Sequence, residues 1–249
     1  MSGMRKDLRN QAQSRAISMH LGGVNEVDGA SKYSQGKTSV LATVVGPVVP
    51  KFARHENSEK CTIEIEVNYA SNLENLNNNG NNISEIAIAD FLKASILPAI
   101  QSELFPRKLI VIQVLILQNE GSIFSVALNA CVLALLDAAI PMYYYMACVQ
   151  IAVISNELFV DPVEEEEKNA EGNLTICIKG SQMKPDEENA ENIELMGEKE
   201  DKILSMEFSG VVQSNLIEPL VEAACKYSKA LSATIRETIA TKVSTTAMY

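Results

Sequence analysis

The segment YSQGKTSVLATVVGP, residues 33–47, contains the Gly-Lys-Thr-Ser sequence that ends a phosphate-binding P-loop. A P-loop also needs a glycine five positions before its Gly-Lys pair. That position holds Ser31, and the nearest earlier glycine, Gly29, lies two residues too early. A P-loop then opens a helix, whereas residues 39–45 are rich in β-branched side chains, which favour a strand. The segment therefore predicts a β-hairpin instead of a nucleotide site.

The predicted hairpin has two strands of unequal length. Residues 25–33 are expected to form the first strand, residues 34–37 the turn, and residues 38–45 the second strand. Gly46 and Pro47 follow the second strand and are expected to end it.

The composition is that of an acidic globular chain. The chain has 249 residues, of which 47% are hydrophobic, and a net charge of −11. This length can bury a substantial core in one large domain. Nucleic-acid backbones are bound by clustered Lys and Arg, so the charge argues against a free-standing nucleic-acid binder. It remains compatible with a local basic patch in a subunit of a larger assembly.

The cysteine and histidine content argues against a zinc site. The five cysteines are Cys61, Cys131, Cys148, Cys177 and Cys225. No pair has metal-ligand spacing, and only His20 and His55 accompany them, so no metal or other cofactor is expected. Buried free thiols in a reducing compartment are expected instead. Residues 1–15 contain no apolar signal-peptide core.

One nearly apolar run, residues 127–154, has the length of a membrane span. Asp137 and Pro141 interrupt it, and an Asp at the bilayer centre costs about 2.5–3.5 kcal/mol on insertion scales. We therefore expect a helix that ends near Ala139, followed by a strand, and no membrane partner.

Periodicity predicts the remaining elements. Strands are expected at residues 61–69, 108–117, 143–154, 158–160, 174–178 and 203–208. Helices are expected at residues 84–104, 125–139 and 215–240, with Ser84 and Asn215 as caps. Residues 1–20 are expected to be a flexible N-terminal arm, and residues 21–249 a single domain with a disordered acidic insertion at 181–201. Because hairpins followed by a helix occur twice, the class is α+β with duplicated units.

Several ordered motifs resemble those of the ribonuclease-PH-like family. The hairpin carries the family's Asp-Gly, Gly-x-Thr and Gly-Pro pattern at Asp28, Gly29, Gly36, Thr38, Gly46 and Pro47. Three later motifs match at Glu85 and Ile86, at residues 135–138, and at Asp161, Pro162 and the glutamates that follow. The resemblance spans roughly residues 24–240.

The resemblance implies a ribonuclease-PH-like (ribosomal protein S5 domain 2-like) α+β fold, with two sheets packed around helices. The Gly-Pro and Asp-Pro motifs together are similar to those of ring subunits of the eukaryotic RNA exosome. Such a subunit would join other ribonuclease-PH-like chains in a six-membered ring. Its further partners would be cap subunits with S1 and KH domains, an associated catalytic ribonuclease, and RNA in the channel. The expected localisation is the nucleus, nucleolus and cytoplasm.

The same resemblance implies that the phosphorolytic site is degenerate. Active relatives hold phosphate with two arginines, because the anion needs guanidinium donors in a fixed geometry. The matching positions here are Asn82 and Phe124, and residues 61–92 contain no Lys or Arg. An asparagine can donate a hydrogen bond, but a phenylalanine cannot bind phosphate. No enzyme activity is therefore expected from this chain alone.

Two acidic positions of active relatives match Asp161 and Glu167. A hydrolytic, metal-bound role for this pair is one interpretation. A solvated acidic turn is the favoured one, because charge runs are usually solvated faces.

Lys51 and Arg54 form the local basic pair expected to lie nearest RNA. They match a pore-facing loop in relatives, and a solvent-facing loop without RNA contact is an equal alternative.

Three functions remain open from the sequence. The leading one is a non-catalytic exosome ring subunit in rRNA processing and RNA degradation. The second is an active phosphate-dependent 3′–5′ exoribonuclease that uses residues shared with a neighbouring subunit. The third is an unrelated binding or kinase-like protein that uses Gly36, Lys37 and Thr38.

Overall fold

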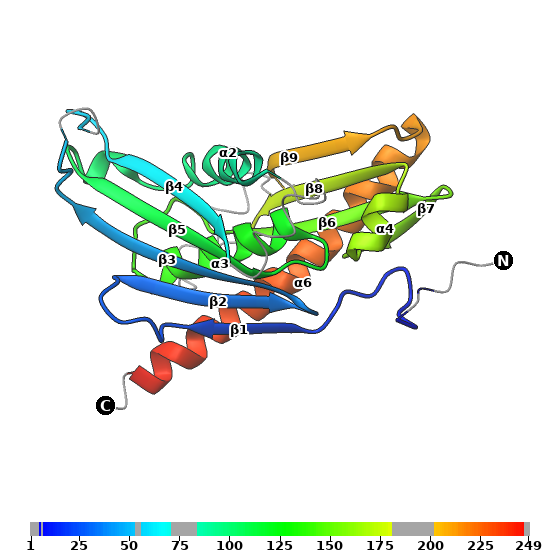
Figure 1. The fold of residues 1–249 in the computed structure, drawn as a ribbon, viewed down its shortest axis with the longest axis horizontal. Coiled ribbons are helices and arrows are strands. Elements are labelled where there is room, and N and C mark those ends of the chain that lie inside the picture. The colour runs from blue at the N-terminus through cyan, green and yellow to red at the C-terminus, as the bar shows by residue number, and fades with distance from the viewer. Residues whose placement is uncertain (1–4, 6, 53–55, 71–83, 181–201, 247–249) are drawn as a thin grey trace, which may run out of the picture.

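The computed structural model describes residues 5, 7–52, 56–70, 84–180 and 202–246. Arg54, Asn82 and the predicted acidic insertion at 181–201 lie outside these residues. The described residues form two sheets with helices between and behind them (Figure 1).

The first sheet has five strands in the order β1-β2-β3-β5-β4. These are β1 (Ile17–Leu21), β2 (Gly29–Gln35), β3 (Thr38–Val48), β4 (Thr62–Tyr69) and β5 (Leu109–Gln118). Only β4 and β5 pair in parallel within this sheet. A parallel pair needs a long crossover, and α2 (Glu85–Ile96) with the short 3-10 helix η2 (Ser102–Leu104) lies in that connection.

The second sheet has four antiparallel strands in the order β7-β6-β8-β9. These are β6 (Met146–Ile154), β7 (Glu157–Val160), β8 (Gly172–Lys179) and β9 (Ile203–Gly210). The short helix α4 (Glu164–Asn169) joins β7 to β8, and α6 (Ser214–Thr246) packs on β6 and β8. The last predicted helix is confirmed, and it buries a stripe formed by Leu220, Ala224, Leu231 and Ile235.

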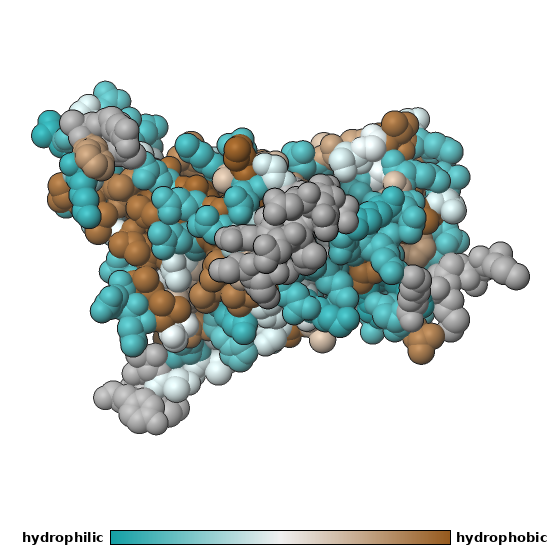
Figure 2. Space-filling model, viewed as in Figure 1, coloured by the Kyte–Doolittle hydropathy of each residue, from teal (hydrophilic) through white to brown (hydrophobic). Residues whose placement is uncertain are grey.

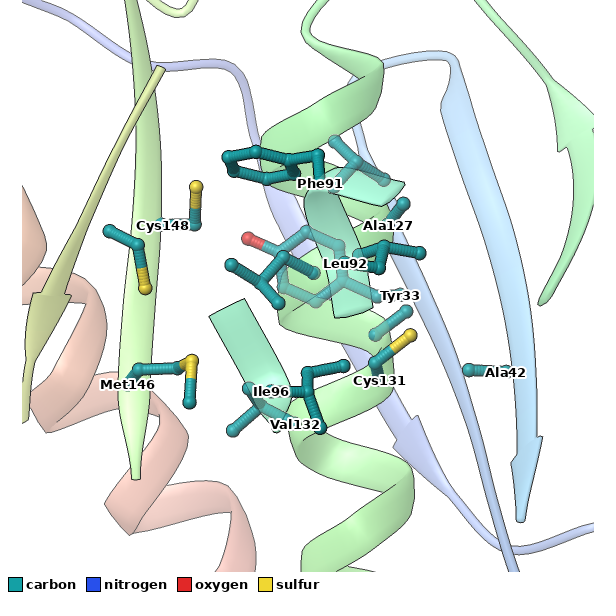
Figure 3. Packing of buried hydrophobic residues seen from close by; sticks show 14 of the residues in the cluster. Tyr33, Ala42, Phe91, Leu92, Ile96, Ala127, Cys131, Val132, Met146 and Cys148 are labelled. Atoms are coloured by element: carbon teal, nitrogen blue, oxygen red, sulfur yellow. The ribbon is translucent and has the colours of Figure 1, made fainter. Parts of the chain in front are cut away.

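Helix α3 (Ile123–Asp137) lies between the two sheets and contacts β2 and β3 on one side and β6 on the other. Figure 3 shows Cys131 and Val132 of α3 between Ala42 of the first sheet and Met146 of the second. A helix packed on two sides must be apolar nearly all round, which explains the run that resembled a membrane span. In the part of the chain that the structure describes, no helix is long and apolar enough to cross a membrane.

A polar contact also fixes α3 to the second sheet. The Asn129 side chain donates to the Cys148 carbonyl and accepts the Cys148 N–H, both at 2.9 Å. Asn129 is fully buried, so this pairing supplies the hydrogen bonds that a buried amide requires.

The predicted hairpin is confirmed, since β2 and β3 pair from Gln35↔Thr38 to Gly29↔Val44. The P-loop interpretation is wrong because Gly36 and Lys37 form the turn and strand β3 follows. Gly36 has φ +60°, and a Cβ there would lie 2.4 Å from the Arg15 side chain, so the turn needs glycine.

Several element bounds differ from the prediction. The first hairpin strand begins at Gly29 instead of residue 25, and Asn215 lies inside α6 instead of capping it. Helix α2 ends at Ile96 and not at residue 104, because Pro98 has no N–H and cannot continue the helix. Residues 17–20 of the segment expected to be a flexible arm belong to strand β1, which pairs with β2.

Candidate functional site

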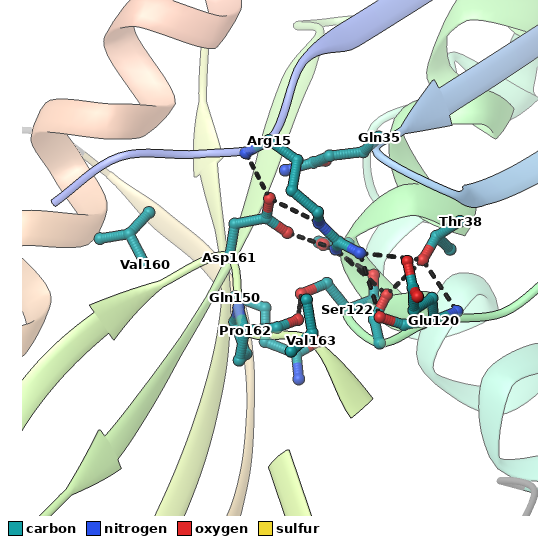
Figure 4. Close-up of polar contacts among 12 residues, drawn as sticks. Arg15, Gln35, Thr38, Glu120, Ser122, Gln150, Val160, Asp161, Pro162 and Val163 are labelled. Atoms are coloured by element: carbon teal, nitrogen blue, oxygen red, sulfur yellow. Dashed lines mark hydrogen bonds and ion pairs between the residues drawn. The ribbon is translucent and has the colours of Figure 1, made fainter. Parts of the chain in front are cut away.

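The candidate site lies where the β2–β3 hairpin, the start of α3 and the segment after β7 meet. Figure 4 shows Arg15, Thr38, Glu120 and Asp161 converging there. The turn before α3 packs tightly on the segment after β7, since a Cβ at Gly121 would lie 2.6 Å from the Glu164 nitrogen. Gly121 also has φ +98°, so this junction depends on glycine.

Asp161 directly follows β7 and is only 1% exposed. Its Oδ1 accepts from Arg15 Nη2 at 2.5 Å, and its Oδ2 accepts from Arg15 Nε at 2.9 Å and from the Arg15 backbone N–H at 2.7 Å. Burial acts to raise the pKa of Asp161, but the hydrogen bonds and charge of Arg15 outweigh it, so this pKa is lowered. Asp161 is therefore an ionised carboxylate in a buried ion pair.

Glu167 lies in α4, close to the start of α3. Its Oε1 accepts from the Ser122 backbone N–H and from Gln150 Nε2, both at 2.6 Å. Burial is the largest effect on this carboxyl, and it raises the pKa of Glu167 to about 7. At neutral pH the carboxyl group therefore exists in both protonation states.

The favoured expectation of a solvated acidic turn is wrong for this pair. The run after β7 forms helix α4, whose Glu165 is exposed, but Asp161 is buried and Glu167 is hydrogen-bonded at the helix junction. The reason is that Arg15 and the Ser122 N–H supply the partners that let carboxyl groups leave water.

Phe124 lies in the first turn of α3 and points its ring at Phe91 of α2. The ring centroids are 5.3 Å apart and the ring planes make an angle of 78°, an edge-to-face contact. The position that the resemblance matches to a phosphate-binding arginine is therefore part of an apolar cluster.

An open pocket of about 730 Å³ lies beside these groups, and its basic lining residues are Arg5, Arg15 and Lys37. Each of them is paired with a carboxylate: Arg5 with Glu166, Arg15 with Asp161, and Lys37 with Glu120. A phosphate ion entering this pocket would compete with a carboxylate for each cation.

Lys51 does not lie at this site. It is exposed and follows the C-terminal end of β3, whereas Thr38 at the other end of β3 contacts the site. An 11-residue strand spans roughly 35 Å at 3.2–3.4 Å per residue. The structure thus brings Asp161, Glu167 and Phe124 into one region and leaves Lys51 apart.

Three residues of the site, Arg15, Ser122 and Gln150, were not predicted from the sequence. Arg15 stands alone in a polar segment, and its partner Asp161 is 146 positions away, so no local pattern reveals the pair. Across the described ranges, no group of three or more His, Cys, Asp or Glu side chains is placed to hold a metal ion.

Comparisons with known proteins give one consistent family. The model of the 3′ exoribonuclease family, domain 1, matches residues 13–141, and the model of domain 2 matches residues 144–207. The exosome complex component ski6 of Schizosaccharomyces pombe is 26% identical over 185 residues, covering 73% of this chain and 75% of that protein. The exosome complex component Rrp41 of Thermococcus onnurineus is 28% identical over 180 residues, covering 71% and 72%.

Solved structures of exosome proteins share the fold. Rice (Oryza sativa) Rrp46 matches with a TM-score of 0.74 and 22% identity, covering 94% of this chain and 100% of that one. An Archaeoglobus fulgidus exosome with RNA bound to the active site matches with a TM-score of 0.72 and 16% identity, covering 92% of both chains. The comparisons confirm the resemblance to exosome ring subunits. Residues 27–29 and 128–140 predict a likeness to the subunit called ribosomal RNA processing protein 46; at 22% identity, the match to rice Rrp46 shows a shared fold.

Proposed function

The chain belongs to the 3′ exoribonuclease family, and from this premise we propose that it is a non-catalytic ring subunit of an RNA exosome. The observation that carries the proposal is that, among the described residues, each basic side chain lining the pocket is paired with a carboxylate. Phosphorolysis places an inorganic phosphate against a phosphodiester, and both are anions. A site for them needs unpaired guanidinium or equivalent donors.

Phe124 supports the same conclusion. The Phe124 ring is half-buried against the core and packs edge to face on the Phe91 ring, so an apolar contact occupies this position. Buried apolar contacts of this kind stabilise the fold and contribute no donor. The chain has therefore kept the family's scaffold and lost its anion-binding chemistry at the described positions.

The proposed subunit joins other ribonuclease-PH-like chains in a six-membered ring beneath S1 and KH cap subunits. RNA passes through the ring to an associated 3′–5′ exoribonuclease, in rRNA processing and RNA degradation. The proposed localisation is the nucleus, nucleolus and cytoplasm. Lys51 and Arg54 are the proposed RNA contacts, since Lys51 is an exposed cation in an otherwise acidic chain.

A second candidate is a phosphate-dependent exoribonuclease completed by a neighbouring subunit. The raised pKa of Glu167, about 7, favours it because a proton-transfer group works best near the ambient pH. This candidate requires arginines from the neighbour.

The test is affinity purification of the full chain from its native cell in high salt, which screens incidental charge contacts. Recovery of five other ribonuclease-PH-like chains and three cap proteins in near-equal amounts supports the ring. Recovery of the chain alone, or as a self-assembled oligomer, contradicts it.

The purified assembly then separates the two candidates. If the assembly releases nucleoside diphosphates in a phosphate-dependent reaction, and this release persists after Glu167→Gln, the result supports a non-catalytic role for this chain. Release that disappears with Glu167→Gln, while ring composition is unchanged, supports the second candidate. A matched Glu164→Gln assembly controls for loss of a charge on α4.

A further inference from the structure

Arg5 and residues 7–16, here called the N-terminal strap, precede β1 and lie against the second sheet. The Val160 N–H donates to the Gln11 carbonyl at 2.9 Å, and the Tyr227 hydroxyl of α6 donates to the Ala12 carbonyl. Figure 1 shows the strap beside β7 and α4 before the chain continues into β1 of the first sheet. The strap therefore covers the edge of β7. Like α3, it connects the two sheets, because it continues into β1 of the first sheet.

All five N–H donors of the Arg15 guanidinium group are hydrogen-bonded at this junction. Five hydrogen bonds use its side-chain nitrogens: two to the Asp161 carboxylate and one each to Thr38 Oγ1 (3.2 Å), the Glu120 carbonyl (3.1 Å) and the Gly121 carbonyl (3.3 Å). An arginine has five N–H donors in a fixed fork, whereas a lysine has three donors on one point charge. The oxygen atoms at this junction therefore form a receptor that is specific for a guanidinium.

Arg5 has a second receptor, and it is only 4% exposed. Its guanidinium pairs with both oxygens of Glu166, at 3.0 and 3.1 Å, and donates to the Val160 carbonyl at 2.7 Å. Its central carbon lies 5.4 Å from the centroid of the Phe159 ring, which adds a cation–π contact.

No large apolar side chain anchors the described part of the strap. Leu8 is its one large hydrophobic residue, and this side chain is 75% exposed. Segments that bury little apolar surface open locally at a lower free energy than the whole domain. The strap is thus held by charge-assisted hydrogen bonds and can detach while the core stays folded.

We propose that Arg5 and residues 7–16 form a releasable strap whose two arginine receptors close the acidic junction. While the strap is bound, Arg15 occupies Asp161 and Arg5 occupies Glu166, so neither carboxylate can bind a metal ion, a phosphodiester or a partner's cation. Asp161 is retained in this chain as the anchor of Arg15. This inference does not depend on the proposed function in a ring.

The test is hydrogen exchange of the full chain, followed by mass spectrometry of peptides 7–16, 157–163 and 123–137. In the wild type the first two peptides are protected. Arg15→Gln and Arg15→Lys each raise exchange in both peptides by at least about tenfold, since a charged hydrogen-bond network is lost, and leave peptide 123–137 unchanged. Arg107→Gln is the matched control, because Arg107 forms an exposed pair with Glu56.

Two results overturn the proposal: exchange of wild-type peptide 7–16 at the rate of an unfolded chain, or wild-type protection in Arg15→Lys. If the Arg15 variants also loosen peptide 123–137, Arg5→Gln decides. Faster exchange confined to peptides 7–16 and 157–163 in Arg5→Gln supports a strap. Exchange that is unchanged, or that rises throughout the chain, contradicts it.

Discussion

The Phe124 ring meets the Phe91 ring edge to face at 5.3 Å, and this contact joins the first turn of α3 to α2. At the position that the resemblance matches to a phosphate-binding arginine, this chain therefore has a packing interaction between two helices. Its free energy can be measured directly.

A double-mutant cycle of Phe91→Leu and Phe124→Leu isolates the ring–ring contact. We expect a coupling free energy of about 0.5–1.5 kcal/mol, because edge-to-face pairs contribute this beyond area burial. The measurement is urea unfolding of the four proteins. The control is Phe124→Leu combined with Phe208→Leu on β9, for which the two changes in the free energy of unfolding should add. If the changes for Phe91→Leu and Phe124→Leu also add, the prediction is contradicted.

Asp161→Asn should loosen the segment that carries Arg15 and lower the free energy of unfolding at neutral pH by at most about 3–5 kcal/mol, since it leaves the buried Arg15 charge without its carboxylate. The pKa of Asp161 is lowered, so its contribution is present above the unfolded value near 3.8 and is lost as pH falls through the folded value. Denaturation of both proteins at several pH values checks this. Glu164→Gln, which removes the exposed i,i+4 pair with Lys168, should cost only about 0.3–0.5 kcal/mol.

Glu167 should give the opposite pH dependence. Its folded pKa of about 7 lies above the ordinary value of 4.5, so the folded state binds the proton more tightly than the unfolded state. The free energy of unfolding should therefore fall as pH rises from 4.5 to about 7, by at most about 3 kcal/mol. Glu167→Gln should remove this decline, and equal slopes in the two proteins would refute the assignment.

Lys51→Glu should weaken RNA contact of the assembled ring without changing its composition. Loss of one phosphate contact lowers the slope of log affinity against log salt by about 0.7 for a single strand. Fluorescence anisotropy with single-stranded RNA at several salt concentrations measures this slope. Lys37→Glu, at the opposite end of β3, is the control. Equal losses of RNA affinity in both variants would show that the net charge of the chain, and not a contact by Lys51, determines the affinity.

The hairpin and the buried helix were predictable because their signals are local. Residues 38–45 show the β-branched run of a buried strand, and α3 shows an apolar run interrupted at Asp137. Strand β1 was missed although Ile17, Met19 and Leu21 alternate with polar residues. Five residues at a sheet edge give too short a pattern to separate from a polar arm.

The site was predictable only in part, because its partners are distant in sequence. The motif positions identified Asp161, Glu167 and Phe124, but nothing near them indicates Arg15, Gln150 or Phe91. Burial of Asp161 depends on an ion pair that forms only when the two sheets meet. A run of acidic residues by itself therefore predicts side chains in contact with water. The tertiary structure instead gives Asp161 and Glu167 hydrogen-bond partners inside the protein.

The position of α3 also limits how this chain can change through evolution. By sequence α3 belongs to the first family domain, yet its side chains and the Asn129 amide contact the sheet of the second. A substitution on α3 must suit two sheets at once, so compensating changes have to arise on both sides of residue 142. The two family domains can diverge together in this chain, but neither can be exchanged for a relative's without its counterpart.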